Sequence, residues 1–299
     1  MIGKPGEDAL SAGYIKGKTS MTAGNFKSWE RGISESVGRL CLVTFVLVMV
    51  VISANAQKAD PKDPENVRRG QELIKQAIEA RGGVRYMTFK SVVSTGIYTP
   101  YEKGMSTIPV PFVDTIVYPD SERVEFGKGK KKNKRIQVNV GKTGWVYDGD
   151  AETIKDQTDK QIQDHLDGLE YDLDRLLRTG WKEEGVAVGF AGREETRPGE
   201  RADVVVIELQ ADRKVNILFD QRTHLPLSMV YEKPGDEGLV KHEVRFYQFV
   251  TYDGALFPNI IDFYRNGIQE SRVNYQSVKL NPEIEKNIFT KPASVKAVK

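Results

Sequence analysis

Residues 215–264 read VNILFDQRTHLPLSMVYEKPGDEGLVKHEVRFYQFVTYDGALFPNIIDFY, and this stretch decides the fold. Val215, Ile217 and Phe219 fall on one side of an extended segment, and Leu227, Met229 and Tyr231 fall on one side of the next. A period of two is typical of strands that bury one sheet face. The polar segment 220–224 and the Asp253-Gly254 pair supply turns between apolar segments, since glycine tolerates positive φ. The stretch therefore predicts consecutive β-hairpins in an antiparallel sheet.

The same pattern continues on both sides of this stretch, and it predicts a mainly β (α+β) domain of about eleven strands and two packed helices. The segment 100–111 contains three prolines and is expected to be a loop, because proline removes a ladder donor. Further strands are expected at 86–99, 112–118, 123–127, 136–140, 144–147, 186–195, 203–211 and 270–280. A first helix is expected at 67–81, capped by Asn66 and stopped by Gly82-Gly83.

A second helix is predicted from 159 to 179, where apolar residues recur at steps of three and four. Its apolar stripe consists of Ile162, Leu166, Leu169, Leu173, Leu176 and Leu177. The acidic residues on its other faces are expected to meet solvent: Asp164, Asp167, Glu170 and Asp174. The stripe is open to two interpretations, namely ordinary packing on the sheet and the roof of a cavity.

The N-terminal part of the chain predicts export. Residues 40–52 are uncharged and apolar, basic residues precede them, and Ser53-Ala54-Asn55-Ala56 has the small-x-small pattern of a signal-peptidase site. The apolar run is shorter than the roughly 20 residues of a membrane span. We therefore expect cleavage after Ala56, with a membrane anchor through residues 40–56 as the alternative. Whether residues 1–20 are translated stays open, because Met21 is a second possible start.

Charge and cysteine content exclude several classes of function. Residues 1–56 hold six Lys/Arg and four Asp/Glu, so cleavage would convert the net charge of +2 into a neutral mature chain. A neutral chain does not favour nucleic acid. The only cysteine, Cys41, lies in the predicted signal segment, which excludes disulfides and thiol chemistry from the mature protein.

No catalytic motif is complete. Gly141-Lys142-Thr143 lacks the first glycine of a phosphate-binding loop, and His242-Glu243 lacks a second histidine at 246. The three histidines, His165, His224 and His242, are expected to face solvent. We therefore expect no catalytic residue, no metal site and no cofactor.

Several short motifs occur together in this chain. It has a helix ending in a glycine pair, and a mid-chain hairpin with Gly144-Trp145 and Asp148-Gly149. It also has the turn pattern D-x-x-T-x-x-P from Asp220 to Pro226 and the pattern Y-x-G-x-x-x-P from Tyr252 to Pro258. A closing N-x-x-I-F-x-x-P pattern is matched loosely by Asn287, Ile288, Phe289 and Pro292. In these motifs the chain resembles the periplasmic outer-membrane lipoprotein-sorting proteins (LolA/LolB-like), whose fold is shared with the N-terminal domain of the RseB/MucB regulators.

This resemblance implies a strongly curved antiparallel sheet, or incomplete β-barrel, around a hydrophobic cavity under a helical lid. It implies an exported, periplasmic, monomeric and non-catalytic carrier of lipid or lipoprotein acyl chains. The stripe 162–177 would form the lid, and the floor would be formed by Trp145, Tyr147, Phe219, Met229 and Tyr231. The alternatives are a lipid-responsive sensor of the RseB type, which binds an inner- or outer-membrane protein, and a secreted enzyme.

The basic tip at 128–135 also has two interpretations. It could contact lipid headgroups, at about 1 kcal/mol per basic residue near an anionic surface, or it could be a solvated turn. The candidate headgroup contacts are Lys130, Lys131, Lys132, Lys134 and Arg135. The expected domains are 1–56 (N-terminal extension and signal peptide), 57–65 (disordered leader), 66–292 (lipid-binding domain) and 293–299 (tail).

Overall fold

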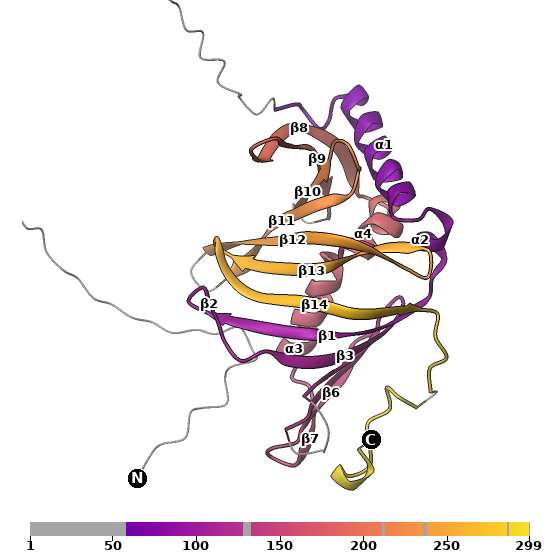
Figure 1. Ribbon diagram of the computed structural model, residues 1–299, viewed down its shortest axis with the longest axis vertical. Coiled ribbons are helices and arrows are strands. Elements are labelled where there is room, and N and C mark those ends of the chain that lie inside the picture. Colours follow the sequence, from indigo (N-terminus) through magenta and orange to yellow (C-terminus); the bar gives the residue numbers. More distant parts are fainter. Residues whose placement is uncertain (1–57, 128–132, 211–212, 236–237, 286, 299) are drawn as a thin grey trace, which may run out of the picture. The chain divides into compact units, whose positions relative to one another are not determined.

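The computed structural model describes residues 58–127, 133–210, 213–235, 238–285 and 287–298 (Figure 1). The predicted signal segment at 40–56, with Cys41 and the cleavage site, lies outside the described residues, as do Lys130, Lys131 and Lys132. The helices are α1 (Pro64–Ala80), α2 (Val84–Thr88), α3 (Asp159–Glu170) and α4 (Leu173–Arg178), with short 3-10 turns at Gly180–Lys182 and Val295–Ala297.

Among the described residues, fourteen strands form one antiparallel sheet. Along the sheet they follow the order β7-β6-β5-β4-β3-β1-β14-β13-β12-β11-β10-β9-β8, and β2 pairs with β1 beside this path. β7 and β8 form the edges and do not pair with each other in the described residues, so the sheet is open. The first half runs through β1 (Ser91–Glu102), β2 (Met105–Ser106), β3 (Val110–Val117), β4 (Ser121–Phe126), β5 (Arg135–Val140), β6 (Thr143–Asp148) and β7 (Thr153–Asp156). The second half runs through β8 (Ala187–Arg197), β9 (Glu200–Glu208), β10 (Lys214–Asp220), β11 (Pro226–Gly235), β12 (Gly238–Tyr252), β13 (Ala255–Arg265) and β14 (Ile268–Leu280).

The predicted fold class is confirmed: the chain is mainly β, with a curved, open antiparallel sheet and packed helices. The stretch 215–264 forms β10 to β13 as successive hairpins, and Asp253 and Gly254 take the positive φ values that the β12–β13 turn requires. The number of strands was underestimated. The segment 100–111 contributes β2 and part of β1 and β3, and residues 84–88 form a short helix instead of the start of a strand.

The two faces of the sheet differ in what covers them. Cross-strand partners place Val244, Phe246, Ile261, Phe263 and Tyr275 on one face, which we call the inner face. The helices pack on the inner face and complete the main hydrophobic core with it. A second, smaller core lies on the opposite face of β5 and β6, under the C-terminal segment.

Helix α1 lies against β8 at one end of the sheet. Its N-cap is Asp63 instead of the expected Asn66, since the Asp63 carboxylate accepts from the backbone N–H groups of residues 65 and 66. At Gly70 the helix touches the strand backbone: an added Cβ would lie 2.7 Å from the carbonyl carbon of Gly189. The absence of a side chain at this position therefore allows the close approach of α1 to the sheet.

The predicted helix at 159–179 is divided into two. α3 ends at Glu170, and Asp172 starts α4 by accepting a hydrogen bond from the backbone N–H of Arg175 at 2.7 Å. Asp172 is an N-cap residue type, which is the sequence signal for a second helix start that periodicity alone did not show. The break allows α4 to enter the core while α3 crosses the sheet.

Candidate functional site

Helix α3 crosses the inner face of the sheet and is attached on both sides of it. Before its first turn, the buried Gln157 side chain donates to the carbonyl of Val138 and the side chain of Asn139 on β5. After its last turn, the ring of Tyr171 stacks on Tyr231 of β11, with 4.1 Å between centroids. In Figure 1, α3 runs across the direction of the strands.

These attachments require a curved sheet. Seven inter-strand steps separate β5 from β11, so the path along the sheet is about 34 Å at about 4.8 Å a step. The helical rise from residue 157 to 171 is only about 21 Å at about 1.5 Å per residue. The sheet therefore bends around α3, and six strands lie between its attachments.

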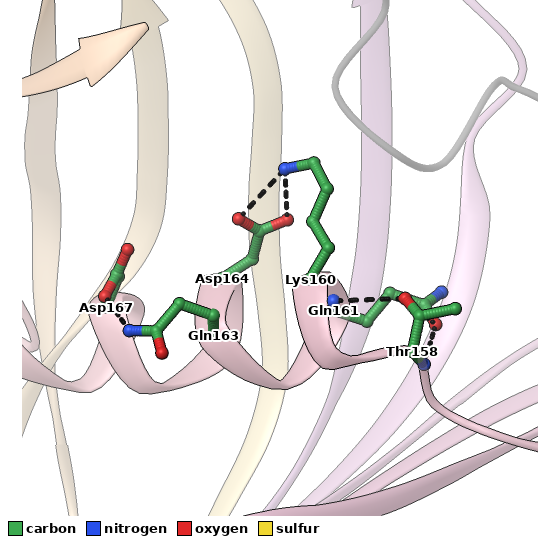
Figure 2. Close-up of polar contacts among 6 residues, drawn as sticks. All are labelled: Thr158, Lys160, Gln161, Gln163, Asp164 and Asp167. Carbon is green, nitrogen blue, oxygen red and sulfur yellow. Dashed lines mark hydrogen bonds and ion pairs between the residues drawn. The ribbon is translucent and has the colours of Figure 1, made fainter.

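The outward face of α3 is polar (Figure 2). Thr158 and Gln161 form a reciprocal capping box. Lys160 pairs with Asp164 at 3.1 Å, and Gln163 donates to Asp167 at 2.7 Å. This confirms that Asp164 and Asp167 belong to a solvated helix face.

The other side of α3 carries the predicted lid residues, but these are not fully buried. Ile162, Leu166 and Leu169 are all half-buried, and α3 has no buried residue at all. In α4 the situation is opposite: Leu173, Leu176 and Leu177 are buried in the main core. The predicted stripe of six residues is therefore divided. Its three residues on α3 keep part of their surface exposed, and its three residues on α4 belong to the hydrophobic core.

The predicted floor residues are divided between the two faces of the sheet. Phe219 and Met229 are buried in the main core, and Tyr231 is half-buried against it beneath Tyr171. Tyr231 also stacks on His242, whose pKa is lowered to about 4 by burial and by the nearby charges of Lys233 and Arg265. His242 is therefore neutral, and half-buried instead of facing solvent as expected.

Trp145 and Tyr147 lie on the opposite face. Gly144 and Asn139 are partners on the inner face, so alternation directs Trp145 outward, where it is opposite Val138. The C-terminal segment covers it, and the indole N–H donates to the carbonyl of Phe289 at 2.9 Å. The structure does not bring Trp145 and Tyr147 together with the other three floor residues.

A cavity of about 250 Å³ lies between the helices and the β3–β4 turn. Its apolar wall includes Ile116, Tyr118 and Leu169, and its polar wall includes Asp120, Glu122, His165, Asp172 and Arg175. Burial raises the pKa of Glu122, and burial together with the Asp174 charge raises the pKa of Asp172 to about 7. No sequence pattern indicates this group, because its members come from a strand, a turn and the helical segment.

His165 is the clearest case in which the structure differs from the expectation drawn from the sequence. We expected it to face solvent, but its side chain is only 10% exposed, and its Nδ1 lies 3.5 Å from the Glu122 carboxylate. Its Nε2 is buried and has no hydrogen-bond partner. Burial lowers the pKa of His165, so the imidazole is neutral near pH 7.

Two acidic residues of the predicted solvated set are paired. Asp174 is paired with the buried Arg81, and Glu170 forms an ion pair with Arg213. Both pairs join the helices to other parts of the chain, since Arg81 follows α1 and Arg213 precedes β10. The expectation of a purely solvated face is therefore wrong for Asp174 and Glu170.

Of the predicted basic contacts, only Lys134 and Arg135 lie in the described residues. Lys134 is half-buried and forms an ion pair with Glu125 at 2.5 Å. Arg135 begins β5, paired with Phe126 of β4 and Asp148 of β6. Within the described part of the chain, no group of three or more His, Cys, Asp or Glu side chains could hold a metal ion.

Among the described residues, no helix is long and apolar enough to cross a membrane. No protein-family model and no curated protein sequence matches this chain. Solved structures do share its fold. A DUF1329 family protein from Desulfovibrio piger is 12% identical with a TM-score of 0.51, over 74% of this chain and 96% of that one.

Two further structures belong to the group that the sequence motifs resemble. A LolA superfamily protein from Nitrosomonas europaea is 14% identical with a TM-score of 0.49, over 74% of this chain and 97% of that one. A structure described as a putative outer membrane lipoprotein-sorting protein domain, from Vibrio parahaemolyticus, is 12% identical with a TM-score of 0.49, over 76% of this chain and 98% of that one. At these identities a likeness concerns the fold and not the chemistry, and the DUF1329 family protein, with a TM-score of 0.51, is the neighbour that supports a shared fold.

Proposed function

We propose that this protein is an exported, non-catalytic carrier that binds the acyl chains of a lipid or lipoprotein between α3 and the inner face of the sheet. The observation that carries the proposal is incomplete burial on both sides of this contact. Ile162, Leu166 and Leu169 are half-buried on the helix. On the sheet, Tyr231, Ile261, Phe263 and Tyr275 are also half-buried, although they lie centrally on the covered face.

An apolar ligand between the two surfaces would complete the burial of these apolar residues. Burial of an acyl chain contributes about 0.8 kcal/mol per methylene. A chain of about sixteen carbons would thus gain roughly 13 kcal/mol before the costs of binding. Outward movement of α3 as ligand enters would require release of its attachment at Gln157 or at Tyr171.

Localisation follows from the same proposal. The signal segment predicted at 40–56 would export the chain, and a periplasmic carrier would need no anchor in the membrane. The proposed partners are a lipid or lipoprotein acyl chain and the membrane proteins that deliver or receive it.

The test is native mass spectrometry of protein purified from cells. We expect bound lipid in the wild type, and we expect its loss in Leu169→Asp, because a carboxylate would then face the acyl chain. The matched control is Gln163→Glu, which adds a carboxylate to the outward face of the same helix (Figure 2) and should retain the lipid. Only apo protein in the wild type, with no uptake of added fatty acid or lipopeptide, would refute the proposal.

A further inference from the structure

One end of the sheet is formed by the β1–β2 hairpin and by the connections β11–β12 and β13–β14, and we call it the turn end. Helix α2 lies at the other end, because the carbonyl of Arg81, just before α2, accepts from the N–H of Leu256 near the start of β13. In Figure 1, β2 lies on the left of the sheet and α2 on the right. Strand β13 spans Ala255–Arg265, so about 33 Å separate the two ends at about 3.3 Å per residue.

Exposed apolar side chains are concentrated at the turn end. Among the described residues, five large apolar side chains are more than half exposed, and four of these stand at this end. They are Met105, Ile108, Leu239 and Ile268, which are 56% to 82% exposed, and the fifth is Val84 of α2. Exposed apolar residues that are scattered singly are ordinary, whereas a cluster marks a surface that contacts a protein or a membrane.

The four side chains come from neighbouring segments of the chain. Ile268 lies beside the β1–β2 hairpin, because a Cβ built on Gly104 would be 4.0 Å from its Cγ2. The β13–β14 turn is joined to β12, since the N–H of Asn266 donates to the carbonyl of Lys241 at 2.8 Å and its side chain accepts from the Lys241 N–H at 3.0 Å. Leu239 precedes Lys241 by two residues on β12. The exposed residues therefore form one apolar surface across three connections.

The inner face of the sheet stays apolar between the turn end and α3. Tyr98 pairs with Val273, and its ring centroid lies 5.5 Å from that of Phe126. The strand register places these three residues on the same face as Tyr275, and all of them are half-buried. An acyl chain that entered at the turn end would thus contact apolar side chains along its path to α3.

Positive charge is also present at the turn end. Lys103 and Lys241 are exposed there. The β4–β5 connection begins at the same end, because the N–H of Gly127 donates to the carbonyl of Pro111 at 2.9 Å. The sequence between Gly127 and Asn133 contains four lysines. Basic residues of this kind strengthen binding to an anionic membrane surface.

We infer that the turn end docks on the surface of a lipid bilayer, with Met105, Ile108, Leu239 and Ile268 inserted at the boundary between headgroups and acyl chains. A bilayer fits better than a protein, because the four side chains are aliphatic and stand on separate connections. The cores of protein interfaces are closely packed and enriched in aromatic residues. A contact of four side chains is reversible, since even a single myristoyl chain gives only marginal membrane binding.

Docking would bring the apolar inner face to the membrane that supplies or receives an acyl chain. Only this use of the docked state rests on the proposed carrier function. The docking itself rests on the exposed side chains and the charges beside them, so each of the two can fail without the other.

A local probe tests the contact. An environment-sensitive fluorophore would be attached at Ile108→Cys or, as the matched control, at Val84→Cys, each with Cys41 replaced by serine. Both positions are highly exposed, so neither substitution should disturb the fold. On addition of vesicles of phosphatidylethanolamine and phosphatidylglycerol, we expect a blue shift of the emission at position 108 and none at position 84. No shift at position 108, or the same shift at both positions, would overturn the inference.

Vesicle sedimentation measures the strength of the contact. The double variant Met105→Gln/Ile108→Ser should bind the vesicles at least about tenfold more weakly than the wild type, because two apolar side chains leave the contact. The control Val84→Ser should bind as the wild type does, and both variants should keep its melting temperature. Equal binding by the double variant and the wild type would contradict an apolar contact, even if anionic lipid raised the affinity of both.

Native mass spectrometry of the same proteins separates this inference from the carrier function. Wild type that retains bound lipid without a shift at position 108 would overturn the docking surface and leave the carrier function intact. A shift at position 108 in protein that carries no lipid would support the docking surface and refute the carrier function. A turn end that contacts a membrane protein instead would give no shift with protein-free vesicles, and this result would also overturn the inference.

Discussion

Arg81 and Asp174 form an ion pair that joins the end of α1 to the first turn of α4, with 2.5 Å between Nη1 and Oδ1. Arg81 is 1% exposed, and it also donates to the carbonyl of Leu256 and to the hydroxyl of Tyr86. Tyr86 in turn donates to Asp174. This network holds the first turn of α4 in a fixed position. α3 directly precedes α4 in the chain, so its C-terminal end is held in place as well.

Replacement of one partner would leave a buried charge alone. We expect Asp174→Asn and Arg81→Leu each to lower the free energy of unfolding by about 3–5 kcal/mol, measured by urea denaturation. The double variant should be less destabilised than the sum of the two. Arg175→Ala serves as the control, because its pair with Glu183 is solvent-exposed and should contribute about 0–1 kcal/mol.

The two parts of the leucine stripe should differ in their effect on stability. Leu176 has no exposed surface, and its replacement by alanine should cost about 2–5 kcal/mol. Leu166 is half-buried, and Leu166→Ala should cost less than about 1.5 kcal/mol in the ligand-free protein. Equal losses in thermal or urea denaturation would contradict the distinction between a structural α4 and an incompletely packed α3.

Asp172 should make stability depend on pH. Its pKa is about 7 in the folded protein, because of burial and the Asp174 charge, and about 4 when unfolded. Its contribution to stability is thus fully present below pH 4 and is lost as the pH rises to 7.

Asp172→Asn keeps an N-cap side chain but cannot ionise. We expect this variant to equal the wild type in stability near pH 4 and to exceed it by at least about 1 kcal/mol at pH 8, in urea denaturation. Asp164→Asn, at an exposed position, should show no such trend. A difference that is constant with pH would show that Asp172 ionises normally.

The C-terminal segment should be needed for the second core. Removal of residues 288–299 would uncover Ile136, Val138, Trp145 and Tyr147, which this segment buries on the outer face. We expect a lower melting temperature and a red shift of Trp145 fluorescence. Lys291→Ala should change neither, because its ion pair with Asp156 lies at the surface.

Local patterns in the sequence predicted the hairpins from β10 to β13, since both alternation and turn residues lie within a few positions. They could not predict which side of β6 faces the helices. Trp145 and Tyr147 alternate as the other floor residues do, and only the packing of Phe289 and its neighbours, about 140 positions later, shows that they face outward.

The polar part of the candidate site was similarly invisible to local patterns. Arg81 reads as an ordinary residue before a glycine pair, and its partner lies 93 positions away. His165 lies next to the apolar stripe in sequence, and its burial depends on Glu122 of a distant strand. Pairs of this kind are set by the path of α3 across the sheet, which no single-segment pattern contains.

The central claim is that acyl chains lie between α3 and the inner face, and fluorescence quenching tests it directly. A fluorophore would be attached at Leu169→Cys or, as the matched control, at Gln163→Cys, each with Cys41 replaced by serine. Lipids brominated along their acyl chains quench only fluorophores that they contact. We predict strong quenching at position 169 and little at position 163; equal quenching at both positions, or none at 169 despite bound lipid, would contradict the claim.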